Sequence, residues 1–160
     1  MVREIVPPET GLAFAPMRAL RTDLADEAAF VRRVDEVQRP EGYRLVGAFA
    51  EGTPRAVAVA GFRVAHSLSW GRFLYVDDLS TLPEARRLGY GRALLDWLST
   101  EGRRLGCGQL HLDSGVGPER GLGRTRRGAW ARRIPLKLLR KISSAETPGR
   151  DSRAVRRVRP

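Results

Sequence analysis

Apolar residues recur at helical spacing in two segments near the start of the chain. The two series are Ala13, Met17, Leu20 and Leu24, followed by Phe30, Val34 and Val37. Positions three or four residues apart share one face of a helix, so each series predicts an amphipathic helix. Asp26 lies between them and is a residue type that favours the N-cap position, whereas Pro40 and Gly42 stop the second helix.

After residue 42 the pattern becomes that of β-strands. The segment YRLVGAFA (43–50) is followed by turn residues and then by RAVAVAGFRV (55–64), which predicts a hairpin. A second turn, HSLSWG, leads into RFLYVDDLST (72–81). These segments predict three antiparallel strands.

A further helix and strand follow a loop that runs from residue 82 to residue 88. The helix presents one apolar face, made by Leu94, Leu98 and Leu105, and Gly106 suits the left-handed position past its end. Alternation in QLHLD (109–113) predicts the next strand. Because a loop and a helix connect 72–81 to 109–113, we expect these strands to be parallel neighbours. The predicted fold class is α/β (α+β), with a mixed, mostly antiparallel sheet and flanking helices.

The formal charge of +11 comes from the end of the chain alone. Residues 1–116 hold 15 arginines and 15 acidic residues, whereas residues 117–160 hold 14 basic and 3 acidic residues. We therefore predict a near-neutral folded domain (1–116) and a basic, Arg-rich C-terminal segment (117–160) that is partly disordered. A segment of this charge is typical of binding to nucleic acid or to an anionic membrane. The alternative is a diverged or out-of-frame end that carries no selected function.

The C-terminal segment also lacks strand alternation. Only residues 130–142, interrupted by Pro135, combine basic and apolar positions in a way that indicates ordered structure. We therefore expect the last strands of the sheet to be missing or replaced by the basic tail. In that case the strand at 109–113 has an unpaired edge, which favours aggregation or a homodimer.

Other compositional features favour a cytoplasmic protein. No run reaches the roughly 18 apolar residues of a membrane-spanning helix, and the first residues do not resemble a signal peptide. The lone Cys107 excludes an intrachain disulfide and a multi-cysteine metal site, so no metal is expected.

A glycine loop precedes the third predicted helix. In RRLGYGR (86–92), Gly89 and Gly91 allow backbone N–H groups to approach an anion closely, and the helix dipole and three arginines favour negative charge. The alternative is a tight loop with solvated arginines. The loop lacks the Gly-Lys-Ser/Thr of a nucleoside triphosphate site and the third glycine of a dinucleotide site.

The motif RRLGYG (86–91) resembles the Arg/Gln-x-x-Gly-x-Gly/Ala signature of GNAT-superfamily N-acetyltransferases. The preceding LYVDDLSTLPEA resembles that family's fourth strand, and the order of elements over residues 1–116 is similar. The resemblance implies acetyl-coenzyme A as co-substrate, its pyrophosphate on the loop and its pantetheine in a gap between the fourth and fifth strands. The residues assigned to it are Leu79, Ser80, Thr81, Arg86, Arg87, Leu88, Gly89, Tyr90, Gly91, Arg92 and Ser114. Among these, the backbone of Leu79 and Thr81 matches the positions that contact pantetheine.

Three residues are candidates for the catalytic chemistry. Asp77 and Asp78 are consecutive and therefore point to opposite faces of a regular strand. Asp77 would share its face with Tyr75 and Leu79, and the resemblance implies a general base there; the alternative is that both acids are structural. His111 alternates with apolar neighbours, which allows it to reach the cleft; the favoured alternative is an ordinary histidine on the surface of the strand.

The family's C-terminal Tyr, which protonates the coenzyme A thiolate, is absent because no Tyr follows Tyr90. The predicted function is transfer of an acetyl group from acetyl-coenzyme A to an amine. The rival reading is a catalytically impaired scaffold of this kind whose basic tail binds nucleic acid or an anionic membrane.

Overall fold

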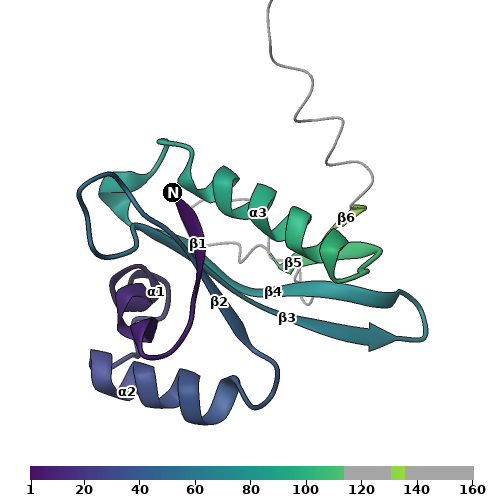
Figure 1. Ribbon diagram of the computed structural model, residues 1–160, viewed down its shortest axis with the longest axis horizontal. Helices are drawn as coiled ribbons and strands as arrows, with labels where there is room; N and C mark the ends of the chain where they lie inside the picture. The colour runs from purple at the N-terminus through teal and green to yellow at the C-terminus, as the bar shows by residue number, and fades with distance from the viewer. Residues whose placement is uncertain (114–130, 136–160) are drawn as a thin grey trace, which may run out of the picture.

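A single mixed sheet forms the middle layer of the protein (Figure 1). The computed structural model describes residues 1–113 and 131–135. The strands are β1 (Val2–Ile5), β2 (Arg44–Ala48), β3 (Ala58–Ser67), β4 (Gly71–Thr81), β5 (Gln109–Asp113) and β6 (Ala131–Pro135), and they lie side by side in chain order. Among these described strands, only β4 and β5 are parallel neighbours. The predicted mixed, mostly antiparallel sheet is therefore confirmed.

Helices cover both faces of this sheet. The N-terminal group consists of η1 (Glu9–Ala13), α1 (Phe14–Leu20), α2 (Glu27–Arg32) and η2 (Arg33–Gln38); after β4 come η3 (Pro83–Ala85) and α3 (Tyr90–Arg104). In Figure 1, α1 and α2 lie on one side of the sheet and α3 lies on the other. The predicted N-cap is confirmed, because the Ala29 amide donates to Asp26 Oδ1 at 2.7 Å.

Each face has its own apolar core. On the α3 side, Leu94 and Leu98 are fully buried and pack against Phe62 of β3 and Leu74 of β4. The N-terminal helices pack against the other face with their buried side chains Met17, Phe30 and Val34. Burying one side chain of this size stabilises the fold by about 1.5–3 kcal/mol. Most positions of the apolar series read from the sequence therefore mark the faces that hold the layers together, whereas Leu20 and Val37 are exposed.

The sixth strand corrects the expectation for the C-terminal segment. Residues 131–135 pair antiparallel with β5, from Gln109 opposite Pro135 to Asp113 opposite Ala131. The prediction that β5 has an unpaired edge is therefore wrong, because β6, which lies within the part of the basic segment expected to be ordered (130–142), pairs with it. Strand pairing is a tertiary contact, and a segment without alternation can still supply the backbone groups for it. Other residues of the basic segment lie outside the described ranges. The predictions of partial disorder and of nucleic-acid binding concern those residues and stay predictions.

An ionic network joins α3 to β1 and β2. Glu101 on α3 accepts hydrogen bonds from Arg104 (Nε and Nη2, both 2.7 Å) and pairs with Arg44 of β2 at 2.7 Å. Arg44 also bonds both carboxylate oxygens of Glu4 in β1. The hydrogen bond from Arg104, together with that from Arg44, lowers the pKa of Glu101 from 4.5 to about 2. The charged carboxylate therefore holds the N-terminal strands against the helix.

We expect Glu101→Gln to lower the free energy of unfolding by about 1–3 kcal/mol at pH 7, because it removes a buried, charge-assisted acceptor. The difference from the wild type should shrink as pH falls from 4.5 toward 2. Over that range the unfolded chain takes up the Glu101 proton first, so the wild type loses this stabilisation. Urea unfolding of both proteins at pH 7, 5, 4 and 3 measures this difference in unfolding free energy. Asp96→Asn, on the exposed face of the same helix, should change little; an equal loss there would contradict the assignment.

Candidate active site

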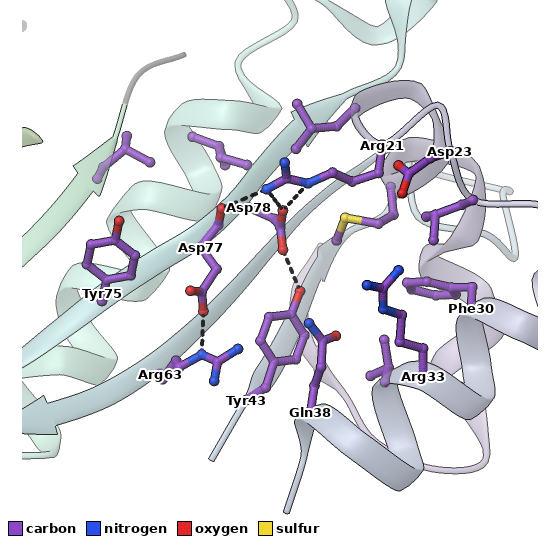
Figure 2. A pocket seen from close by; sticks show the side chains of 16 residues that line it. Arg21, Asp23, Phe30, Arg33, Gln38, Tyr43, Arg63, Tyr75, Asp77 and Asp78 are labelled. Atoms are coloured by element: carbon purple, nitrogen blue, oxygen red, sulfur yellow. Dashed lines mark hydrogen bonds and ion pairs between the residues drawn. The ribbon is translucent and has the colours of Figure 1, made fainter. Parts of the chain in front are cut away.

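A cavity of about 940 Å³ opens between β4 and the N-terminal helices (Figure 2). Its walls include apolar side chains from α1 and α2, among them Met17 and Phe30, and side chains of the second half of β4. Six charged groups also line it, namely Arg21, Asp23, Arg33, Arg63, Asp77 and Asp78. A cavity of this size holds a small organic molecule, and its mixed walls suit a polar group on an apolar body.

A β-bulge brings the two consecutive aspartates to the same cavity. Gly61 of β3 pairs with Asp78 and Phe62 pairs with Val76, so Asp77 is the extra residue on β4. A bulge interrupts the alternation of side chains, and both carboxylates consequently line the cavity (Figure 2). The expectation that Asp77 and Asp78 point to opposite faces is therefore wrong, because it assumed a regular strand. Tyr75 and Leu79 line the same cavity, as expected.

Asp78 is a structural anchor between β4, α1 and the start of β2. Its Oδ1 accepts hydrogen bonds from Arg21 Nε at 2.8 Å and Nη2 at 2.6 Å, and its Oδ2 accepts one from the Tyr43 hydroxyl at 3.0 Å. The residue is only 8% exposed. Both carboxylate oxygens are thus engaged, and burial beside this carboxylate raises the pKa of Tyr43, which stays protonated. This environment favours the structural reading of Asp78.

Asp77 has a different environment. Its Oδ2 accepts one hydrogen bond, from Arg63 Nε at 2.9 Å, and its side chain remains 25% exposed. Burial raises the pKa of Asp77 above its ordinary value, and the hydrogen bond from Arg63 opposes this only in part. A carboxylate with a raised pKa, an accessible edge and a place on the cavity wall is suited to accept a proton.

Sequence reasoning missed Arg21, Tyr43 and Arg63, which complete this cluster. An ideal Cβ on Gly61 would stand only 1.7 Å from the Tyr43 hydroxyl oxygen, so the glycine makes room for the ring that reaches Asp78. No local pattern connects these positions, which lie on α1, before β2 and on β3. Only the isolated glycine inside the strand pattern at 55–64 signals a close approach.

His111 lies outside the cavity, contrary to expectation. It is 1% exposed, and its ring stacks on Trp70 with ring centroids 4.1 Å apart. Phe73 packs edge-on against it, and its Nε2 is 3.0 Å from Gln109 Oε1. A buried, aromatic-enclosed imidazole on the paired part of β5 is a core residue, so we assign it no catalytic step.

The second half of β4 has an open edge toward β5. Parallel pairing of these strands ends at Val76 opposite Leu112, so no described pairing covers residues 77–81 on that side. The Leu82 amide donates to the Val57 carbonyl, which makes Ala58 and Thr81 a non-hydrogen-bonded pair. By the same alternation, the backbone N–H and C=O of Leu79 and Thr81 point away from β3 and into the open edge. Those of Ser80 point toward β3, so its backbone is used within the sheet.

The glycine loop begins α3 next to the end of β4. Gly89 is the N-cap with φ +86°, and no side chain caps the first turn. An ideal Cβ on Gly91 would lie 3.6 Å from Thr81 Oγ1, so the helix start adjoins the open edge. Positive φ also occurs at Arg87, and such left-handed residues are found in turns whose amides gather around an anion. The helix N-terminus, the loop and the β4 edge therefore form one continuous surface.

The charged and apolar residues of this loop face outward. Arg86, Arg87, Leu88 and Arg92 are exposed, whereas Tyr90 packs against the α3-side core. Arg86 Nε donates to the Thr81 carbonyl at 3.4 Å, and Arg92 is 3.6 Å from Asp96. Ser114 lies outside the described residues. Within the described ranges, no helix combines the length and apolar character needed to cross a membrane.

Comparison with known proteins places these features in a family. The chain is 35% identical over 100 residues to an uncharacterized N-acetyltransferase of Bacillus subtilis (strain 168), YhdJ, which covers 62% of this chain and 68% of that protein. An acetyltransferase from Trypanosoma brucei has a similar fold, with a TM-score of 0.61 and 19% identity over 79% of this chain and 96% of that one. A ribosomal-protein-alanine N-acetyltransferase from Brucella melitensis biovar Abortus 2308 also has a similar fold. Its TM-score is 0.61, and it is 17% identical over 99% of both chains.

A third structure, a predicted acetyltransferase from Clostridium acetobutylicum determined with acetyl-CoA, has a TM-score of 0.56 and 16% identity over 72% of this chain and 81% of that one. The sequence profile of the acetyltransferase (GNAT) family matches residues 12–120, which include the cavity, the open β4 edge and the glycine loop. The resemblance read from RRLGYG is thereby confirmed, and this protein belongs to the GNAT family of acetyltransferases.

Proposed function

We propose that this enzyme transfers the acetyl group of acetyl-coenzyme A to an amine held in the cavity beside Asp77. The observation that carries the proposal is the continuity of three features: the cavity, the open β4 edge and the uncapped start of α3. One end of that surface offers a base, and the other offers amides for an anion. The geometry thus suits a long donor with a thioester at one end and a pyrophosphate at the other.

The described residues fit such a donor. The pantetheine amides lie along the open edge, where the backbone groups of Leu79 and Thr81 point away from β3 and only the Thr81 carbonyl has a described partner, the Arg86 side chain; the pyrophosphate lies at the start of α3. Acetyl-coenzyme A supplies the activated acetyl group as a thioester. The Leu79 N–H donates to the thioester oxygen and stabilises negative charge that develops there.

The acceptor amine approaches from the cavity. Its nitrogen forms a bond to the acetyl carbon, the carbon–sulfur bond breaks, and the amine proton passes to Asp77 directly or through one water. The Asp77 carboxylate is suited to this step because burial raises its pKa. Asp77 then releases the amine proton to solvent, and the leaving thiolate takes up a proton from solvent, which balances the step.

Two measurements test the proposal. Calorimetric titration with acetyl-coenzyme A should show one site with a Kd in the range of about 1 µM to 1 mM, typical of enzyme substrates. S-acetylpantetheine, which lacks the pyrophosphate, should bind at least about tenfold more weakly, because it cannot reach the start of α3. Amine-dependent release of coenzyme A thiol then reports the transfer. Equal binding of the two thioesters would contradict the phosphate site, and thiol release that no amine stimulates would contradict the transfer.

A further inference from the structure

Arg33 is exposed at the cavity and has no side-chain partner in the described part of the chain. Arg21 is paired with Asp78 and Arg63 with Asp77, as the dashed lines of Figure 2 show. Among the described residues, no side chain forms a hydrogen bond or ion pair with the Arg33 guanidinium, although this residue lines the same cavity. An arginine at a cavity wall without a carboxylate partner is a ready site for an anion.

η2 brings a second donor, Gln38, to the same cavity as Arg33. This segment is a π-helix, with the Arg39 amide bonded to the Val34 carbonyl five residues earlier at 2.9 Å. In such a helix residue i+5 stacks close to residue i, and Arg33 and Gln38 are its first and last residues. Both line the cavity, and Figure 2 shows both side chains on the wall formed by α2 and η2. An ordinary α-helix would turn them away from each other, and π-helical turns are frequent at functional sites.

We propose that Arg33 and Gln38 bind a carboxylate of the acceptor, which is therefore an amine carrying both a carboxylate and an apolar body. This inference rests on the proposed function and specifies its substrate class. A guanidinium and a neutral amide together match a single negative charge. Asp23 lines the same cavity and disfavours a doubly charged group such as phosphate.

The apolar part of the acceptor fits the wall between α1 and α2. Leu20 is 42% exposed, and Leu24 and Phe30 line the cavity beside it. Phe30 is only 3% exposed, so the apolar surface open to the cavity belongs to Leu20 and Leu24, and an apolar substituent would cover it. An apolar α-amino acid combines the three required parts, with its amino group directed to Asp77 and its carboxylate to Arg33.

The test measures acetyl transfer by the full chain from acetyl-coenzyme A to each of three acceptors, namely phenylalanine, phenylalaninamide and phenethylamine. We expect kcat/KM for phenylalanine to exceed the other two at least about tenfold, the usual worth of a charge-assisted hydrogen bond. Arg33→Gln should remove this preference by weakening phenylalanine alone. Arg32→Gln is the matched control, because Arg32 is an exposed neighbour that does not line the cavity. The amide's amino group is a weaker base than that of phenylalanine, so amine ionisation cannot produce a preference for phenylalanine over phenylalaninamide, which is the decisive comparison.

Calorimetric binding of the same compounds separates this inference from the proposed function. If phenylalanine binds the wild type at least about tenfold more tightly than it binds Arg33→Gln, while phenethylamine binds both equally, the carboxylate site stands even if no turnover is seen. Turnover of all three amines at equal kcat/KM would overturn the carboxylate site and leave acetyl transfer intact. If Arg33→Gln lowered kcat/KM equally for all three acceptors, the carboxylate site would likewise be overturned, since Arg33 would then have a merely structural role.

Discussion

Asp77→Asn is expected to lower the rate of acetyl transfer by about 10²–10⁴-fold, the usual cost of losing a general base. The amide keeps the shape of the side chain and can still bond Arg63, but it cannot take the amine proton. Affinity for acetyl-coenzyme A should change little, because the proposed donor site is the neighbouring open edge. Steady-state rates and calorimetric titration of the same preparation measure the two quantities.

The pH dependence adds a second signature of this role. Burial raises the pKa of Asp77, so wild-type kcat/KM should fall on the acid side as pH drops through that raised value and the carboxylate becomes protonated. The Asp77→Asn variant should lack this acid limb. Raising the pH should partly rescue it, since more of the amine is then deprotonated in solution.

Asp78→Asn is the matched control on the adjacent residue. Its carboxylate holds Arg21 and Tyr43, so this variant should lose about 1–3 kcal/mol of unfolding free energy. Its rate per folded molecule should fall much less than that of Asp77→Asn. If Asp77→Asn and an active wild type have equal rates from pH 6 to 9, Asp77 has no part in the proton transfer.

Gly89→Val is expected to weaken acetyl-coenzyme A binding by at least about a hundredfold. The residue has φ +86°, a conformation that a β-branched side chain strongly resists, so the loop must rearrange. The amides at the start of α3 would then no longer converge on the pyrophosphate. Calorimetric titration measures the affinity, and thermal unfolding measures the accompanying loss of stability.

Gly106→Val separates loss of binding from loss of stability. Gly106 lies past the other end of α3 with φ +72°, and like Gly89 it has open space around an added Cβ. Both variants carry the same kind of backbone strain, so their melting temperatures should fall similarly. Only Gly89→Val should affect acetyl-coenzyme A. Comparable affinities in these two variants would place the pyrophosphate elsewhere.

Local patterns were sufficient to predict most of the elements. The series through Met17 and Phe30 predicts the N-terminal helices, alternation predicts β2 to β5, and Asp26 predicts a cap that the structure confirms. These features depend on neighbours within a few residues, so they are readable without the fold. The signature RRLGYG was equally informative, because a turn with positive φ followed by a helix start is a local structure.

The arrangement of the candidate site depended on contacts between distant segments. The bulge that brings Asp77 and Asp78 to one cavity arises from the pairing of β4 with β3, and regular alternation predicted the opposite. The partners Arg21 and Tyr43 reach Asp78 from positions 57 and 35 residues away. Such contacts form only after the layers pack.

His111 and β6 show the same division between local pattern and tertiary contact. The pattern of β5 places a histidine on a strand, but only packing against Trp70 removes it from the cavity. Residues 131–135 carry no strand alternation, yet the backbone groups of β5 give them a partner. Secondary structure follows from side chains close in the chain, whereas the surroundings of Asp77 and Asp78 and the cavity follow from which strands and helices lie side by side.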